Sequence, residues 1–154
     1  MIQESFFHDE TPAAGRMDGS QGRKAVRAGE TAETFIYQMF RQRGYPVERQ
    51  VEIGLNIYGY PTRCDFIVRR LPGLAAGLII ESKWQQAGGS VDEKYPFLVA
   101  NIRAWYPHPT IILADGGGAR PGAIQWLRSQ VDGRKLIGVY SFSELIKWFI
   151  DRGY

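Results

Sequence analysis

Residues 60–86 read YPTRCDFIVRRLPGLAAGLIIESKWQQ, and they contain two short apolar runs that each carry charged residues. The first run, RCDFIV, holds Asp65, and the second, GLIIESKW, holds Glu81 and Lys83. Such runs are typical of buried strands, where a carboxylate is costly unless it is paired or binds a metal ion. Because side chains alternate along a strand, Glu81 and Lys83 project from the same face. If the two runs pair as neighbouring strands, Asp65 lies within a few ångströms of Glu81.

This order, an aspartate followed after a hairpin-like gap by Glu-x-Lys, resembles the motif of the PD-(D/E)xK nuclease superfamily. The resemblance covers about residues 28–145, and Cys64-Asp65 stands where the family has Pro-Asp. It implies an α/β fold of the restriction-endonuclease-like type, with an αβββαβ core and a mixed central sheet flanked by helices. A C-terminal strand and helices are expected beyond that core.

Periodicity and turn signals predict the same order of elements in the first half of the chain. Residues 1–22 show no periodicity and are expected to form a flexible arm, which leaves residues 23–154 as one domain. A helix is expected over about residues 28–43, and a strand at residues 47–53 precedes the two acid-bearing strands. The predicted buried stripe of that helix consists of Ala32, Phe35, Ile36, Met39 and Phe40.

Helices and strands are expected to alternate in the second half. Two Ser-x-x-Glu patterns have the spacing of a capping box and predict helix starts at Ser90 and Ser141. Strands are expected at residues 109–114 and 135–140, with a helix from Pro121 to about residue 130 between them. The helix that Ser90 opens is expected to bury Val91, Tyr95, Leu98, Val99, Ile102 and Trp105.

The resemblance also implies how the charged residues would act in phosphodiester hydrolysis. Asp65 and Glu81 would hold Mg²⁺, with Mn²⁺ able to substitute, and the backbone carbonyl of Ser82 is a further candidate ligand. Lys83 would orient or deprotonate the attacking water and stabilise the charge at phosphorus. Gln85 shares the face of Glu81 and Lys83 and would contact the substrate phosphate or the water.

Many members of the superfamily complete the metal site with a glutamate from the first helix. At about 100° per residue, Glu33 lies at the margin of the buried stripe, whereas Glu30 points away from it. Glu33 is therefore the candidate for this role. The alternative is that both glutamates are solvated charges on the helix surface.

The charged cluster also has a structural alternative. Glu81 and Lys83 could form a same-face ion pair at a strand end, with Asp65 capping a turn. Three charges in otherwise apolar strands favour the chemical interpretation, because surface charges are not expected there. Alternation places Cys64 on the face opposite Asp65, where it is expected to be a core residue rather than a nucleophile.

The composition is that of a globular protein, with 44% hydrophobic and 23% charged residues and a net charge of +3. Of 19 cationic residues, 14 are arginine, whose guanidinium matches phosphate geometry, although a GC-rich genome would give the same bias. The single cysteine excludes an internal disulfide. No segment resembles a membrane span or a signal peptide, so a cytoplasmic protein without a membrane partner is expected.

DNA is the expected partner, and a restriction or homing-type endonuclease of a mobile element is the preferred role. A Holliday-junction resolvase or a repair nuclease is the enzymatic alternative. A non-catalytic nucleic-acid-binding module is disfavoured because the charged motif is intact, and a glycosidase is disfavoured by Lys83 and by the element order. Candidate DNA contacts are Arg23, Lys24, Arg27, Arg63, Lys94 and Arg120.

A dimer or a higher oligomer is expected, because one active site cuts one strand and symmetric pairing supplies a second site. In the last helix, one stripe can cover the sheet: Phe142, Leu145, Ile146 and Phe149. Trp148 points away from the centre of that stripe and is a candidate contact with another chain. Packing of Trp148 against a neighbouring helix is the alternative.

Overall fold

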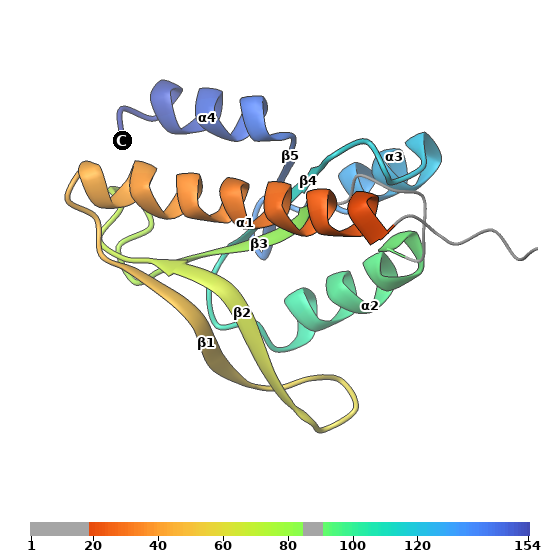
Figure 1. The fold of residues 1–154 in the computed structure, drawn as a ribbon. Helices are drawn as coiled ribbons and strands as arrows, with labels where there is room; N and C mark the ends of the chain where they lie inside the picture. The colour runs from red at the N-terminus through yellow and green to blue at the C-terminus, as the bar shows by residue number, and fades with distance from the viewer. Residues whose placement is uncertain (1–18, 85–90) are drawn as a thin grey trace, which may run out of the picture.

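The computed structural model describes the backbone of residues 19–84 and 91–154, and the side chains of residues 30–83 and 92–154. Within these ranges the elements follow the predicted order, αβββαβαβα. They are α1 (Gly19–Gln42), β1 (Val47–Leu55), β2 (Pro61–Val68), β3 (Leu78–Trp84), α2 (Val91–Ala104), β4 (Thr110–Asp115), α3 (Pro121–Ser129), β5 (Leu136–Tyr140) and α4 (Phe142–Asp151) (Figure 1). α1 therefore includes the end of the expected arm, and the predicted cap at Ser90 lies outside the described residues. No helix in these two ranges is long and apolar enough to cross a bilayer.

The strands form one mixed sheet with the order β1-β2-β3-β4-β5. β1, β2 and β3 are antiparallel, whereas β3, β4 and β5 are parallel because the crossover helices α2 and α3 connect them. β3 pairs with β4 as far as Trp84, but it pairs with β2 only as far as Phe66 and Ile80. Beyond that pair the two strands separate, and the β1–β2 hairpin bends away from the rest of the sheet (Figure 1).

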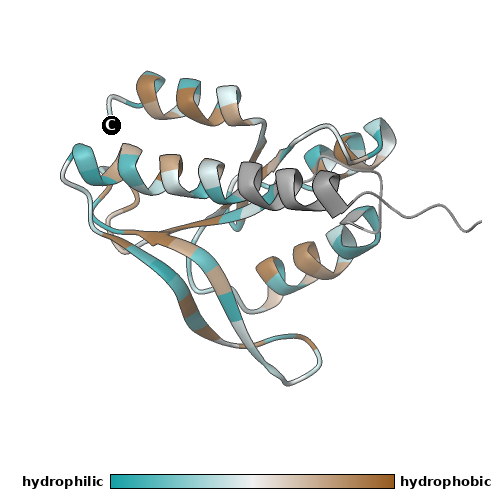
Figure 2. Ribbon diagram, in the orientation of Figure 1, coloured by the Kyte–Doolittle hydropathy of each residue, from teal (hydrophilic) through white to brown (hydrophobic). Residues whose placement is uncertain are grey.

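Helices cover both faces of the sheet and give a three-layer α/β architecture (Figure 1). α1 and α4 pack on one face around a buried cluster that includes Ile36, Phe40, Leu145 and Phe149. α2 and α3 pack on the other face around a second cluster that includes Tyr95, Leu98, Val99, Ile102 and Leu127. Figure 2 shows that hydrophobic residues are concentrated in the middle of β2 and β3 and along α4. The observed fold is the mixed α/β fold predicted from the sequence.

The buried face of α1 is narrower than the sequence predicts. Ala32, Ile36 and Phe40 are buried at helical spacing, but Phe35 is 48% exposed. The Phe35 ring packs edge-on against Phe142 at the start of α4, with ring centroids 5.1 Å apart. The prediction that Phe35 belongs to the buried stripe is wrong because this side chain faces the groove between α1 and α4 rather than the sheet.

The end of α2 differs from the prediction in one residue. Trp105 was expected to be buried, but it is exposed, and Tyr106 is buried instead. The backbone N–H groups of Trp105 and Tyr106 both donate to Asn101 O, at 2.9 and 3.2 Å. Because α2 ends at Ala104, helical spacing no longer sets the direction of the following side chains, and Tyr106 rather than Trp105 turns inward. The side chain of Val91 lies outside the described residues.

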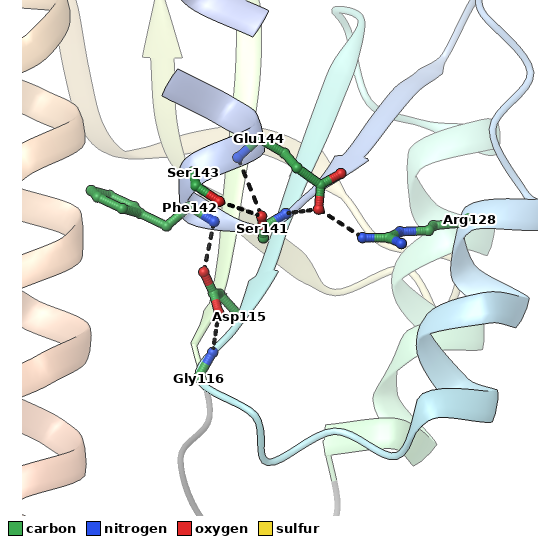
Figure 3. A network of polar contacts seen from close by, with 7 residues as sticks. All are labelled: Asp115, Gly116, Arg128, Ser141, Phe142, Ser143 and Glu144. Carbon is green, nitrogen blue, oxygen red and sulfur yellow. Dashed lines mark hydrogen bonds and ion pairs between the residues drawn. The ribbon is translucent and has the colours of Figure 1, made fainter. Parts of the chain in front are cut away.

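Polar contacts fix the start of α4 against the end of β4 (Figure 3). Ser141 and Glu144 form the predicted capping box: Glu144 N donates to Ser141 Oγ at 3.2 Å, and Ser141 N donates to Glu144 Oε1 at 3.3 Å. The Asp115 carboxylate accepts from Phe142 N at 2.6 Å and from Gly116 N at 2.7 Å. Asp115 therefore links the glycine-rich loop after β4 to α4.

Trp148 is half-buried in an aromatic cluster of its own chain. Its ring centroid lies 6.4 Å from that of Tyr140 and 5.5 Å from that of Tyr154, and the Arg152 guanidinium lies over the indole. The prediction that Trp148 is a large exposed aromatic is wrong because the chain after α4 turns back and covers it. Trp148 packs within its own chain, but against Tyr140 of β5 and Tyr154 after α4 rather than against a neighbouring helix.

Candidate active site

Asp65 and Glu81 occupy the first opposed position at which β2 and β3 no longer pair. The last paired residues are Phe66 and Ile80, so continued register would place Asp65 opposite Glu81. The Asp65 carboxylate reaches across to β3, where its Oδ2 accepts from Ser82 N at 2.7 Å. Its Oδ1 accepts from Gln50 Nε2 on β1 at 3.3 Å. One carboxylate thus connects three strands at the point where the sheet opens.

Glu81 is a buried carboxylate, only 2% exposed. Tyr106 OH donates to its Oε1 at 2.6 Å, and Lys83 Nζ lies 3.4 Å from its Oε2. Burial raises the pKa of Glu81 to about 7; the negative charge of Asp65 adds to this rise, and the Lys83 ammonium opposes it. The charged form of Glu81 therefore needs positive charge nearby, which a bound cation would supply.

Tyr106 is the residue of this site that the sequence did not indicate. It is buried just after α2, and burial together with the adjacent Glu81 carboxylate raises the pKa of its phenol. The phenol is therefore a neutral donor that fixes one Glu81 oxygen. No motif spacing connects a tyrosine after a helix to an acid on the preceding strand, so no sequence signal could have identified it.

Glu33 faces the same charges from α1. The Glu33 side chain is half-buried. Burial is the main cause that raises its pKa, the negative charge of Asp65 adds to the rise, and Arg49 and Lys83 oppose it. Glu30 is exposed. The structure therefore places Glu33, and not Glu30, towards the site. Among the described side chains, no three Asp, Glu, His or Cys residues are close enough together to form a metal site by themselves.

A pocket of about 320 Å³ opens between β2, β3 and α2. Glu81 and Lys83 form part of its wall, and the cationic side chains of Arg63 and Lys94, both exposed, lie at its edge. Its other lining residues are Thr62, Tyr95, Phe97, Leu98, Asn101 and Tyr106. Glu81 is therefore accessible from a cavity that exposed cationic side chains also line, an arrangement suited to an anionic substrate.

The remaining candidate residues do not line this pocket within the described part of the chain. Arg120 Nε pairs with Asp92 at 2.7 Å, and the Arg120 side chain is otherwise exposed. Cys64 is fully buried, and burial raises the pKa of its thiol to about 12, which fits the predicted core role. The other candidates lie where the structure describes no side chain: Arg23, Lys24, Arg27 and Gln85.

The donor set fits a hard divalent cation. Asp65 and Glu81 supply carboxylate oxygens, and each carboxylate has acceptor capacity beyond the hydrogen bonds described above. Mg²⁺ in proteins is held by one or two carboxylates together with waters and substrate phosphate, so two acids are sufficient. Mn²⁺ accepts the same oxygen ligands.

Residues 24–152 match the family model of a PD-(D/E)XK nuclease superfamily domain. No curated protein and no solved structure matches the chain.

Proposed function

Because the chain belongs to the PD-(D/E)XK nuclease superfamily, we propose that it is a metal-dependent endonuclease that hydrolyses DNA phosphodiester bonds. Membership indicates nuclease chemistry, and the finer assignment depends on the site. The observation that carries it is the buried Glu81 carboxylate beside Asp65, with Lys83 on the same strand and a pocket edged by cations. A buried acid with a raised pKa in a cleft is typical of a functional site.

Asp65 and Glu81 are the proposed ligands of Mg²⁺ or Mn²⁺, with the backbone carbonyl of Ser82 as a further candidate. When bound, the ion would polarise a phosphoryl oxygen and lower the pKa of a coordinated water. The chain itself orients the two acids. Tyr106 holds one oxygen of Glu81, while Ser82 N–H and the Gln50 amide hold Asp65.

Lys83 is proposed to act on the water and on the charge that develops at phosphorus. Its ammonium lies 3.4 Å from Glu81 Oε2 and lines the pocket, so it faces both the acid and the space for substrate. A cation fixed in a partly buried site stabilises a developing oxyanion more than one in water. Glu33 is proposed to adjust the site from α1, and Gln85 to contact phosphate after the strand.

Arg63 and Lys94 are the proposed DNA contacts at the pocket, and the expected cluster Arg23, Lys24 and Arg27 remains part of the proposal. A restriction or homing-type endonuclease is the proposed role, with a Holliday-junction resolvase as the enzymatic alternative. Two copies of the chain are proposed to act together, because cleavage of both strands requires two such sites.

One experiment separates these roles. Supercoiled plasmid, a four-way junction and a short RNA are each incubated with the protein in Mg²⁺ and in EDTA. Cleavage of plasmid DNA in Mg²⁺ but not in EDTA, and its loss in the Asp65→Asn variant, would support the proposal. Faster cleavage of the junction than of the plasmid would support the resolvase. Absence of cleavage in Mg²⁺ and in Mn²⁺, with DNA binding intact, would favour a binding module.

A further inference from the structure

The tip of the β1–β2 hairpin carries apolar side chains where a water-exposed loop is expected to be polar. Residues 53–62 read IGLNIYGYPT and contain no charged residue. The side chains of Tyr58 and Tyr60 are 70% and 67% exposed, and Leu55 and Ile57 are also exposed. Figure 1 shows this tip projecting beyond the sheet on the side of α2, and Figure 2 shows hydrophobic positions at it.

The tip is held in one conformation. The Asn56 side chain accepts from Tyr58 N at 2.9 Å and from Tyr60 N at 3.1 Å, and Asn56 N donates to Tyr60 O at 2.7 Å. Gly59, with φ of +81°, supplies the left-handed residue that this turn requires. The exposed rings are therefore presented by an ordered turn. Because the turn is already ordered, it loses little conformational entropy when a ligand binds.

The tip is also joined to the active-site pocket through α2. Ile57 N donates to Asn101 Oδ1 at 2.7 Å, and the Tyr58 ring stacks on Phe97 at 5.2 Å and 27°. Asn101 and Phe97 both line the pocket that contains Glu81 and Lys83. The tip is thus joined, through Phe97 and Asn101, to the wall of the pocket that Glu81 lines.

We propose that this tip, residues 55–60 with Phe97, is a stacking surface for an unpaired base of the DNA strand that enters the active site. The inference rests on the proposed function and specifies the form of its substrate. Exposed aromatic rings beside a cationic groove are the features by which proteins hold single-stranded nucleic acid. Arg63 and Lys94 supply cations in the same pocket that Phe97 and Glu81 line. In an intact duplex the faces of the bases are covered, so the rings select a strand end, a fork or a single strand.

A second copy of the chain fits this surface less well. The patch consists of a few side chains on a narrow turn, whereas a stable interface buries about 800 Å² on each partner. A two-fold contact would also bring the Arg63 and Lys94 side chains of two copies towards one another, and like charges oppose such a contact. An unpaired strand supplies flat bases and negative phosphates, which match both features.

The test is a binding measurement in EDTA, so that it does not depend on cleavage. Fluorescence anisotropy with a labelled 15-nucleotide single strand and its blunt duplex is recorded for wild type, Tyr58→Ala, Tyr60→Ala, Tyr58→Phe and Tyr60→Phe. Loss of one stacked base is expected to raise the single-strand Kd roughly tenfold, and the duplex Kd less than about twofold. The phenylalanine variants should restore binding because the ring, not the hydroxyl, makes the contact. Trp126→Ala, which removes an exposed aromatic from α3, is the matched control.

The outcomes separate this inference from the proposed function. If wild type cleaves DNA and the alanine variants bind the single strand normally, the inference fails and the proposed function stands. If no nucleic acid is cleaved but binding depends on the rings, the proposed function fails and the inference stands. Equal weakening of single strand and duplex overturns the inference. Loss of self-association by light scattering with unchanged DNA binding would show that the tip is an interface between copies.

Discussion

The Tyr106 hydroxyl donates a 2.6 Å hydrogen bond to Glu81 Oε1, joining the end of α2 to the centre of β3. Burial and the adjacent Glu81 carboxylate raise the pKa of this phenol, so the hydroxyl is a neutral donor. Glu81 is thereby held in one orientation, with its second oxygen beside Lys83. The segment that follows α2 thus contributes to the orientation of the acid although it provides no acidic ligand to the site.

Tyr106→Phe should reduce metal-dependent cleavage while preserving the fold, because it removes only this hydroxyl. Substitution of a residue that orients a metal ligand typically lowers metal affinity or activity by about 10- to 100-fold. The measurement is the cleavage rate as a function of Mg²⁺ concentration. Tyr95→Phe is the matched control, since Tyr95 is also buried on the pocket wall and its hydroxyl has no hydrogen-bond partner within the described residues. Equal loss in both variants would contradict the role of Tyr106.

Asp65→Asn should abolish cleavage and weaken Mn²⁺ binding, because a neutral amide is a poor replacement for a carboxylate ligand. Isothermal titration with Mn²⁺ and circular dichroism separate loss of metal from loss of fold. The exposed Glu52→Gln serves as the control. Full activity of Asp65→Asn, or of wild type in EDTA, would rule out the metal assignment.

Glu81→Gln should stabilise the metal-free protein at pH 8 more than at pH 5. Its pKa rises from the ordinary 4.5 to about 7 on folding, so its contribution to stability is present below pH 4.5 and is lost as the pH rises to 7. At about 1.4 kcal/mol per pKa unit, the variant should gain up to roughly 3 kcal/mol relative to wild type across this range. Urea unfolding in EDTA at both pH values measures the gain. An unchanged difference between pH 5 and pH 8 would show that Glu81 is ionised without cost.

Lys83→Ala should lower the cleavage rate on the order of 10²-fold, as expected when electrostatic stabilisation of a transition state is lost. DNA affinity should remain within a few-fold, because Lys83 contributes one charge among several at the pocket. Single-turnover rates and anisotropy titrations measure the two quantities. Lys147→Ala removes a lysine that pairs with Asp151 on the surface and should be silent. A variant that loses affinity but keeps its rate would make Lys83 a phosphate anchor only.

Glu33→Gln should impair Mg²⁺-dependent cleavage about tenfold, whereas Glu30→Gln should be nearly silent. The reason is position: Glu33 senses the charges of Asp65 and Lys83 from the half-buried side of α1, and Glu30 is exposed. The two variants carry the same substitution on one helix, so each controls for the other. The reverse ranking would mean that α1 acts on the site through another residue.

Local patterns predicted the order of the elements and the acidic pair, and the resemblance to the nuclease superfamily implied how the elements are arranged. Alternation fixed the face of Glu81 and Lys83, and the neighbouring strand placed Asp65 beside them. The sequence could not identify Tyr106, since its contact depends on how α2 ends and lies far from Glu81 along the chain. The predicted burial of Phe35 and Trp105 was wrong for related reasons. Helical periodicity does not include the adjacent helix that Phe35 packs against, and it does not show at which residue the helix ends.

The separation of β2 and β3 after Phe66 and Ile80 has a consequence for how the site is built. Had the ladder continued, Ser82 would face Cys64; instead Ser82 N–H donates to the Asp65 side chain. The Asp65 carboxylate, a proposed metal ligand, therefore accepts the hydrogen bond that a backbone carbonyl of β2 would accept in a continued ladder. The amide proton of Ser82 is thus a natural reporter: its chemical shift and its rate of exchange with solvent would register an event at the Asp65 carboxylate even when no substrate is present.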